Sequence, residues 1–253
     1  MGNKFPIISN DRIPNLEFFK AAFQKMEQPP KGKYDEMIKL YLDALDSYPG
    51  IPLNIPRQGS SQKLSAYRVI SEKEFIRIGL KSNELTSYSH PPANPQACRP
   101  QRFNIEGFPV LYAASNEHTA IEEKYDGINL SEGDAFYISK WELKKEIPFA
   151  YIMLFYGNTI DEDYRDIYEA MDRRFESAFG QYTEDKRAAL KYYLRKLTDL
   201  SLVDKFNDLT SALGHYYLYK VSSKIQPIIG YIGYPSVKKR KSGLNFAINR
   251  KLI

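Results

Sequence analysis

One stretch of the sequence organises the rest of the chain: residues 99–123 read RPQRFNIEGFPVLYAASNEHTAIEE. Arg102 comes just before a turn signal at residues 104–107, and the apolar run at 108–114 predicts a buried strand that ends near Tyr112. Rigid elements place reactive side chains more accurately than loops do. We therefore expect a site here, with an arginine and a tyrosine at the edges of one strand.

A helix is predicted directly after this strand. Ser115 or Asn116 has the short polar side chain that a helix N-cap requires, and the first turns that follow carry carboxylates (Glu117, Glu122 and Glu123). An arginine and a carboxylate on neighbouring rigid elements are parts that cleavage of an anionic ligand needs. The spacing alone is equally typical of solvated helix glutamates, and it does not choose between Glu122 and Glu123.

The composition limits the functions to consider. A chain of 253 residues can bury a core without disulfides, and its one cysteine, Cys98, suits a reducing compartment. No signal-peptide pattern and no apolar run long enough to span a bilayer is found, so no membrane contact is expected. The net charge of +5 favours anionic ligands but is too diffuse to indicate direct nucleic-acid binding.

Several common site motifs are missing from the sequence. It has no GxGxxG after a strand and no GxxxxGK followed by Ser or Thr, which argues against Rossmann and P-loop nucleotide binding. His90, His118 and His215 have no metal-ligand spacing with one another or with Cys98, so no metal site is expected. His118 lies one turn before Glu122 and within reach of a site there, although an exposed helix histidine is the commoner case.

The chain divides into two parts. Residues 1–60 predict an N-terminal helical extension, with helices at 15–25 and 33–47 and a linker at 52–62. Residues 61–253 predict the main domain. The expected role of the extension is to pack on the main domain or to meet a partner.

The main domain contains two irregular features. A long charged segment with apolar residues three and four apart predicts a helical insertion at 158–220. The proline-rich segment at 87–100 predicts a loop, which is either a lid over a ligand or an irregular surface loop.

Short strands alternate irregularly with helices in the main domain. Strands are predicted at 64–70, 108–114, 135–143, 149–155, 225–232 and 244–248, and Ser71 to Glu74 has the pattern of a capping box. A doubly wound sheet requires steady strand–helix alternation, which is missing. The pattern therefore predicts an α+β fold with a split, mostly antiparallel sheet, which the last strand closes.

The central stretch resembles the RES-domain family, bacterial toxins that degrade NAD and are named for an arginine, a glutamate and a serine. The family pattern is Arg-aromatic-Asn, a Gly, a strand ending in Tyr, and Thr-Ala-apolar-x-Glu on the next helix. Here the pattern reads Arg102-Phe103-Asn104, Gly107, Val110-Leu111-Tyr112 and Thr119–Glu123, which assigns the family glutamate to Glu123.

Two further landmarks of the family lie outside this stretch. A Pro-Ser pair before a late asparagine corresponds to Pro235-Ser236 and Asn245, and Tyr67-Arg68-Val69 resembles the family's first strand. The sequence departs from the family at Val69, where an aromatic residue often follows the arginine, and in the length of the insertion.

The resemblance implies a fold like that of the ADP-ribosyltransferase toxins, in which NAD lies in a cleft between two small sheets. NAD would be the substrate and not a recycled cofactor, and no metal would be needed. The resemblance also implies a toxin that acts in the cytoplasm and is neutralised by an antitoxin or immunity protein. Delivery as an effector and formation of a homodimer stay open.

Cleavage of the bond between nicotinamide and ribose builds positive charge on the ribose, as in glycoside hydrolysis. By the resemblance, Glu123 would stabilise this cation or position water, and Ser236 would orient Glu123 or bind the ligand. Arg102 would bind phosphate in two-pronged fashion, and Arg68 would bind a second phosphate or the ribose hydroxyls.

The remaining residues would shape the site. Tyr112 would stack on nicotinamide or fix the ribose, Tyr67 is the aromatic residue beside Arg68, and Asn245 would tie the last strand to the site. As a plain structural alternative, Tyr112 belongs to the core and Ser236 caps a turn.

Two other functions stay open. An ADP-ribosyltransferase would use the same residues to modify a macromolecule, but transferases usually carry an acidic residue or glutamine two positions before the catalytic glutamate, where this chain has Ile121. A non-enzymatic partner-binding protein would instead use the N-terminal helices and the insertion. No residue decides between water and phosphate as the acceptor.

Overall fold

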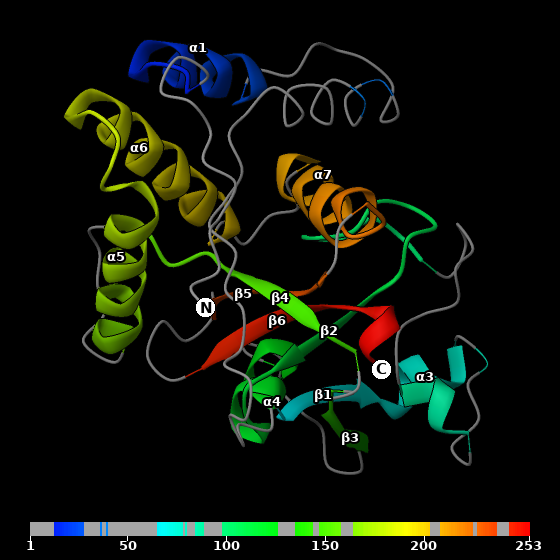
Figure 1. The fold of residues 1–253 in the computed structure, drawn as a ribbon. Coiled ribbons are helices and arrows are strands. Elements are labelled where there is room, and N and C mark those ends of the chain that lie inside the picture. The colour runs from blue at the N-terminus through cyan, green and yellow to red at the C-terminus, as the bar shows by residue number, and fades with distance from the viewer. Residues whose placement is uncertain are drawn as a thin grey trace.

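The computed structural model describes residues 13–27, 36, 39, 65–77, 79, 84–88, 98–125, 135–143, 147–157, 164–202, 208–224, 227–236 and 243–253. Figure 1 shows the elements that they form. The α-helices are α1 (Leu16–Glu27), α3 (Glu72–Arg77), α4 (Glu117–Tyr125), α5 (Arg165–Phe179), α6 (Glu184–Ser201) and α7 (Asp208–His215). The strands are β1 (Ser65–Ser71), β2 (Val110–Ala114), β3 (Phe136–Glu142), β4 (Phe149–Met153), β5 (Ile228–Pro235) and β6 (Leu244–Asn249). The other helices are the 3-10 helices η2 (Leu85–Tyr88) and η5 (Arg250–Leu252) and the π-helix η4 (Tyr216–Val221).

The strands form one sheet in the order β3-β1-β2-β6-β5-β4. Among these described strands, β4 and β5 run parallel and the other neighbours run antiparallel. The sheet is nearly divided between β1 and β2, which align at one pair, Tyr67 with Ala114, whereas β1 and β3 align over all of Ser65–Ser71. The predicted α+β class with a split, mostly antiparallel sheet is therefore confirmed.

The last strand lies in the middle of the sheet. β6 pairs with β2 on one side and with β5 on the other, and from Asn245 to Asn249 its residues are all buried. The prediction that this strand closes the sheet is wrong, because sequence order does not fix strand order. Two antiparallel neighbours satisfy both rows of backbone hydrogen-bonding groups of β6, as the continuous burial requires.

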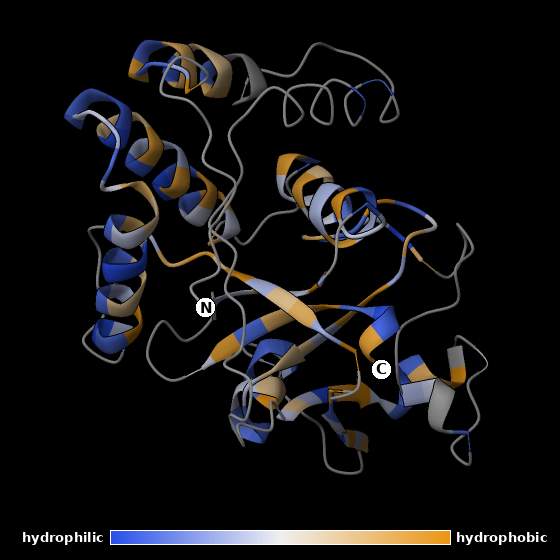
Figure 2. Ribbon diagram, viewed as in Figure 1, coloured by the Kyte–Doolittle hydropathy of each residue, from blue (hydrophilic) through white to orange (hydrophobic). Residues whose placement is uncertain are grey.

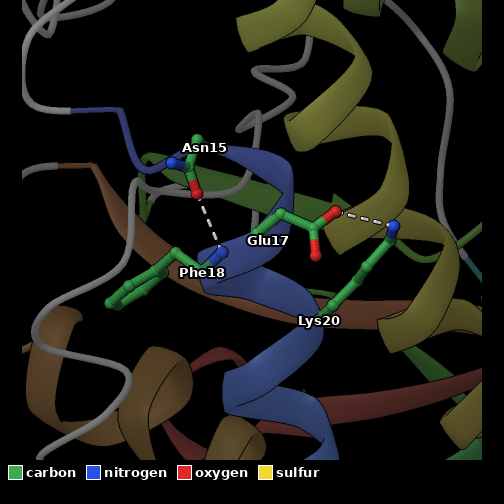
Figure 3. A network of polar contacts seen from close by, with 4 residues as sticks. All are labelled: Asn15, Glu17, Phe18 and Lys20. Carbon is green, nitrogen blue, oxygen red and sulfur yellow. Dashed lines mark hydrogen bonds and ion pairs between the residues drawn. The ribbon is translucent and has the colours of Figure 1, made fainter.

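The first predicted helix of the extension is confirmed as α1. The Asn15 side chain accepts a hydrogen bond from the Phe18 backbone N–H at 2.9 Å, and Glu17 pairs with Lys20 one turn later (Figure 3). Phe19 is buried and stacks on Tyr193 of α6 with 5.0 Å between ring centroids, so α1 packs on the insertion. The predicted helix at 33–47, apart from residues 36 and 39, and the linker at 52–62 lie outside the described residues.

The described residues of the segment predicted as an insertion are mostly helical. Its described part contains α5, α6 and α7, and α7 continues directly into η4. Figure 2 shows hydrophobic and hydrophilic residues in alternate stripes along α5 and α6, as expected for helices with one packed face. The predicted apolar face is buried at its main positions (Met171, Phe175, Phe179, Leu190, Tyr193, Leu194 and Leu197).

Asn249 stabilises the π-helix η4. Its Nδ2 donates hydrogen bonds to the carbonyl oxygens of Leu218 at 2.6 Å and Ile229 at 3.1 Å, which joins η4 to β5. This contact compensates for the irregular hydrogen bonding of a π-helix, which is a rare element. In the part of the chain that the structure describes, no helix is long and apolar enough to cross a membrane.

His215, at the end of α7, packs against two aromatic rings. Its ring centroid is 4.4 Å from that of Phe108 and 5.6 Å from that of Tyr219. Burial, assisted by the positive charge of Lys220, lowers the pKa of His215 from 6.5 to about 4. The imidazole is therefore neutral in the folded protein at neutral and mildly acidic pH.

This low pKa predicts how stability depends on pH. Between pH 6.5 and about 4 the unfolded chain binds a proton at His215 that the folded chain does not, so His215 makes the free energy of unfolding fall as pH falls. We expect His215→Phe, which keeps an aromatic ring, to lose less stability than the parent between pH 7 and pH 4.5. Urea unfolding at both pH values measures this, and equal losses in the two proteins would contradict it.

Candidate active site

Glu123 is the centre of a group that three elements bring together. Asn116 caps α4: its Oδ1 accepts a hydrogen bond from the Thr119 N–H at 2.8 Å, as the predicted N-cap requires. One turn after Thr119, Glu123 Oε1 accepts hydrogen bonds from Asn245 Nδ2 at 2.8 Å and from Ser236 Oγ. Ser236 directly follows β5 and Asn245 belongs to β6, so residues more than 100 positions apart in sequence meet at one carboxylate.

The neighbouring glutamate has a different partner. Glu122 Oε1 is 2.7 Å from Nε2 of His118, whose side chain is 70% exposed. This pair joins positions i and i+4 of the same helix, and the Glu122 side chain is only 12% exposed. The contacts therefore favour Glu123 over Glu122 as the carboxylate of the candidate site. His118 pairs with Glu122 and not with Glu123 in these contacts.

Two hydrogen bonds join the start of β6 to Ser115, just before α4. The backbone N–H of Ser115 donates to the carbonyl of Leu244 at 2.8 Å, and the Leu244 N–H donates to Ser115 Oγ at 3.0 Å. Ser236 is held nearby, since its N–H donates to the carbonyl of Gly243 at 3.2 Å. These bonds fix Ser236 and Asn245 relative to the helix that carries Glu123.

Arg102 lies in a tight turn that is tied down on both sides. The backbones of Gln101 and Asn104 exchange hydrogen bonds at 3.0 and 3.3 Å, and the buried Asn104 amide donates to the carbonyls of Arg99 and Ile105. Gly107 follows with φ of +76°, a conformation that favours glycine. The predicted turn at 104–107 is therefore confirmed.

Tyr112 supports this turn from β2. Its hydroxyl accepts a hydrogen bond from the Phe103 N–H at 2.6 Å and donates one to Asn104 Oδ1 at 3.0 Å. Burial raises the pKa of Tyr112 well above its usual value, so the phenol stays protonated. These contacts assign Tyr112 a positioning role for Arg102, and direct contact with a ligand stays a prediction.

Tyr234 contacts Arg102 and pairs across the sheet with Asn245, the partner of Glu123, and sequence reasoning missed it. Arg102 Cζ lies 5.5 Å from the Tyr234 ring centroid, a cation–π distance, and the Phe103 ring is 4.8 Å away. Burial raises the pKa of Tyr234, Arg102 lowers it and Glu123 raises it, so both charges act on this phenol. A signal was present in the sequence: Tyr234 stands two residues before Ser236, the spacing of side chains on one face of a strand.

The two residues quoted from the first strand, Tyr67 and Arg68, lie on opposite faces of β1. Tyr67 packs against the small cluster of Val69, Ala114 and Ala120 beneath α4, and Lys140 Nζ lies 5.8 Å from its ring centroid. Arg68 extends to the other face, where its Nη1 donates to the carbonyl of Tyr88 at 3.2 Å. The structure thus does not bring the Arg68 side chain into the hydrogen-bonded group at Glu123.

Arg68 is a half-buried cation on β1. Burial lowers its pKa to about 10, with a smaller opposing effect of Glu74, so Arg68 remains charged at neutral pH. Glu74 is itself paired with Lys124. A half-buried guanidinium beside an acid that already has a partner is a candidate for binding an anion.

Metal chemistry and cysteine chemistry find no support among the described residues. No group of three or more His, Cys, Asp or Glu side chains within them could hold a metal ion. Cys98 is buried, and burial raises its pKa, which keeps the thiol protonated.

Comparison with known proteins supports the resemblance found in the sequence. Residues 74–144 match the family model described as the RES domain, which confirms the resemblance to the RES-domain family over this part of the chain. The matched residues include Arg102, Tyr112 and Glu123, whereas Arg68, Ser236 and Asn245 lie outside them. The RES domain is associated with toxin–antitoxin systems and with enzymes that use NAD. No curated protein matches the chain.

Proposed function

We propose, on the premise of a RES domain at residues 74–144, that this chain degrades NAD by cleaving the bond between nicotinamide and ribose. The observation that carries the proposal is the carboxylate of Glu123, held by Ser236 and Asn245 beside the Tyr234–Arg102 pair. The site therefore offers a fixed carboxylate for the positive charge that develops on the ribose and a fixed guanidinium for the pyrophosphate.

Glu123 is suited to stabilise the transition state. Departure of nicotinamide leaves positive charge on the ribose ring, and a carboxylate fixed in advance stabilises that charge without reorganisation. The hydrogen bonds from Ser236 and Asn245 both reach Oε1 and set the orientation of the carboxylate. Ser236 and Asn245 are therefore positioning residues for Glu123 in this proposal.

The arginines are suited to bind the pyrophosphate. Arg102 is held by the turn around Asn104 and by the Tyr234 ring, so little conformational entropy is lost when its planar fork binds phosphate. Arg68 provides a second, half-buried cation on the first strand. We propose that Arg102 binds one phosphate and that Arg68 binds the other or the ribose hydroxyls.

One structural feature argues against the transferase alternative. Ile121, two positions before Glu123, packs against the cluster of Val69, Ala114 and Ala120. The position where a transferase usually carries a polar residue to activate its acceptor is thus part of the core here. We therefore propose that a small acceptor, water or phosphate, takes the ribosyl group.

The match to the RES domain supports a proposal for the biological role. We propose that the protein is a toxin that depletes cytoplasmic NAD and that an antitoxin or immunity protein neutralises it. A lethal phenotype on expression that is relieved by Glu123→Gln would support this role, and equal toxicity of the two proteins would contradict it.

The proposed reaction is tested by product analysis. The purified chain is incubated with NAD in phosphate-free buffer and in phosphate buffer, and the products are separated by chromatography. We expect nicotinamide together with ADP-ribose if water is the acceptor, or with ADP-ribose 1″-phosphate if phosphate is. Intact NAD in both buffers would contradict the proposal.

Tyr234 offers a test of how Arg102 is held. Tyr234→Phe keeps the ring under the guanidinium and should leave the KM for NAD within about threefold of the parent. Tyr234→Leu removes the cation–π contact, worth about 0.5–2 kcal/mol, and should raise KM by roughly 3–30-fold with a smaller change in kcat. Steady-state kinetics of both variants measures this, and equal KM values for Phe and Leu would refute the role of the ring.

A further inference from the structure

The helical insertion contacts both the Ser236–Glu123 group and the turn that carries Arg102. We propose that it positions these two parts of the proposed site. One end of the insertion fixes the Ser236–Glu123 group through Tyr164, and the other end fixes the turn of Arg102 through α7. The inference rests on the proposed function and adds residues that position its catalytic groups. It also predicts that the two ends affect different kinetic constants.

Tyr164 holds the corner where β6 begins. Its buried hydroxyl donates a hydrogen bond to the carbonyl of Gly243 at 2.5 Å and accepts one from the Gly243 N–H at 3.1 Å. The same carbonyl accepts from the N–H of Ser236. One phenol thus satisfies both backbone groups of the residue to which Ser236 is bonded.

Gly243 also contacts the helix that carries Glu123. A Cβ atom at Gly243 would lie 1.9 Å from Oγ1 of Thr119, which is possible only without a side chain. Thr119 is one turn before Glu123 on the buried face of α4. The corner at Gly243 therefore sets the distance between α4 and Ser236, and Tyr164 holds that corner.

α7 holds the turn of Arg102 from the other end of the insertion. A Cβ atom at Gly214 would lie 2.0 Å from the carbonyl oxygen of Phe103, so the helix and the turn are in backbone contact. Ser211, one turn earlier on α7, donates a hydrogen bond from Oγ to the carbonyl of Gln101. The residues on both sides of Arg102 are thus fixed by one face of one helix.

The two contacts predict separate effects. Loss of the Tyr164 hydroxyl should disturb Ser236 and Glu123, the groups proposed to act in the transition state, and should mainly lower kcat. A methyl group at Gly214 should displace Arg102, which is proposed to bind the substrate, and should mainly raise KM. Displacements near 1 Å are known to cost enzymes up to about 100-fold in rate.

A matched control is available within the insertion. Thr198 on α6 is buried, and its Oγ1 accepts from the Tyr156 N–H at 3.0 Å and donates to the carbonyl of Leu194 at 3.0 Å. Thr198→Val therefore removes a buried hydroxyl with two backbone partners, as Tyr164→Phe does, but without a contact to Gly243 or to the turn of Arg102.

The test combines kinetics with hydrogen exchange in the full-length protein. For Tyr164→Phe we expect kcat to fall about tenfold or more and the amide of Gly243 to exchange faster. For Gly214→Ala we expect KM for NAD to rise about tenfold or more and the amides of Phe103 and Asn104 to exchange faster. Thr198→Val should lose a similar amount of thermal stability to the two test variants. Its kcat, its KM and the exchange rates of these amides should nevertheless stay close to those of the parent.

The outcomes separate this inference from the proposed function. The inference is overturned if the amides of residues 103, 104 and 243 exchange at the same rates in Tyr164→Phe and Gly214→Ala as in Thr198→Val. This holds whatever the kcat of the variants. If the parent releases no nicotinamide from NAD, the proposed function fails, and the exchange measurements alone then decide whether the insertion positions these groups.

Discussion

Glu123→Gln should reduce the rate of nicotinamide release from NAD by roughly 10²–10³-fold, the usual cost of removing one preorganised charge-stabilising group. Glutamine has the same shape as glutamate and still accepts the hydrogen bonds from Ser236 and Asn245 at its amide oxygen. The substitution therefore removes the negative charge while keeping the packing. We expect kcat to carry the loss, because the cation on the ribose exists only in the transition state.

The neighbouring residue provides the control for this prediction. Glu122→Gln removes an identical charge one position away, from a carboxylate that pairs with the exposed His118. Its activity should stay within about threefold of the parent, because Ser236 and Asn245 orient the Glu123 carboxylate, which is the one proposed to stabilise the ribose cation. A stronger loss in Glu122→Gln than in Glu123→Gln would show that the working carboxylate has been assigned to the wrong residue.

Arg102→Ala should raise the KM for NAD by roughly 10–100-fold, which corresponds to the ~1.5–3 kcal/mol of a hydrogen bond to a charged group. The guanidinium is the group proposed to bind the pyrophosphate, and it is held over the Tyr234 ring. Arg102→Lys keeps the charge but loses the planar fork, so we expect a KM between those of the parent and of the alanine variant.

Arg99→Ala is the matched control for charge. Arg99 is exposed and lies three residues before Arg102 in the same segment, so its removal changes the net charge equally. Its KM should stay close to that of the parent at physiological ionic strength, where exposed charges are screened. Equal KM values for the two alanine variants would contradict a specific role for Arg102.

The sequence was sufficient to predict features that depend on local patterns. The strand before Tyr112, the cap at Asn116 and the helix that carries Glu123 follow from periodicity and capping, and α1 follows from its apolar spacing. The association of Glu123 with Ser236 and Asn245 was predicted from family resemblance, since residues so far apart meet only when strand order brings them together.

Features that depend on strand order and helix packing were not predictable in this way. The central position of β6 was missed because a buried apolar strand looks the same at several places in a sheet. Tyr234 was missed because its ring reaches Arg102 only through the packing of the turn against β5. The contacts of Tyr164 and Gly214 with the site come from a segment that the resemblance does not cover, so no motif indicated them.

The most direct test of the central claim is a time course of nicotinamide release from NAD by the purified chain, beside Glu123→Gln prepared in the same way. We predict steady release by the parent, with loss of NAD in equal amount, and release slowed at least 100-fold in the variant. Release at equal rates by the two proteins, or intact NAD with the parent in the presence and absence of phosphate, would contradict the account.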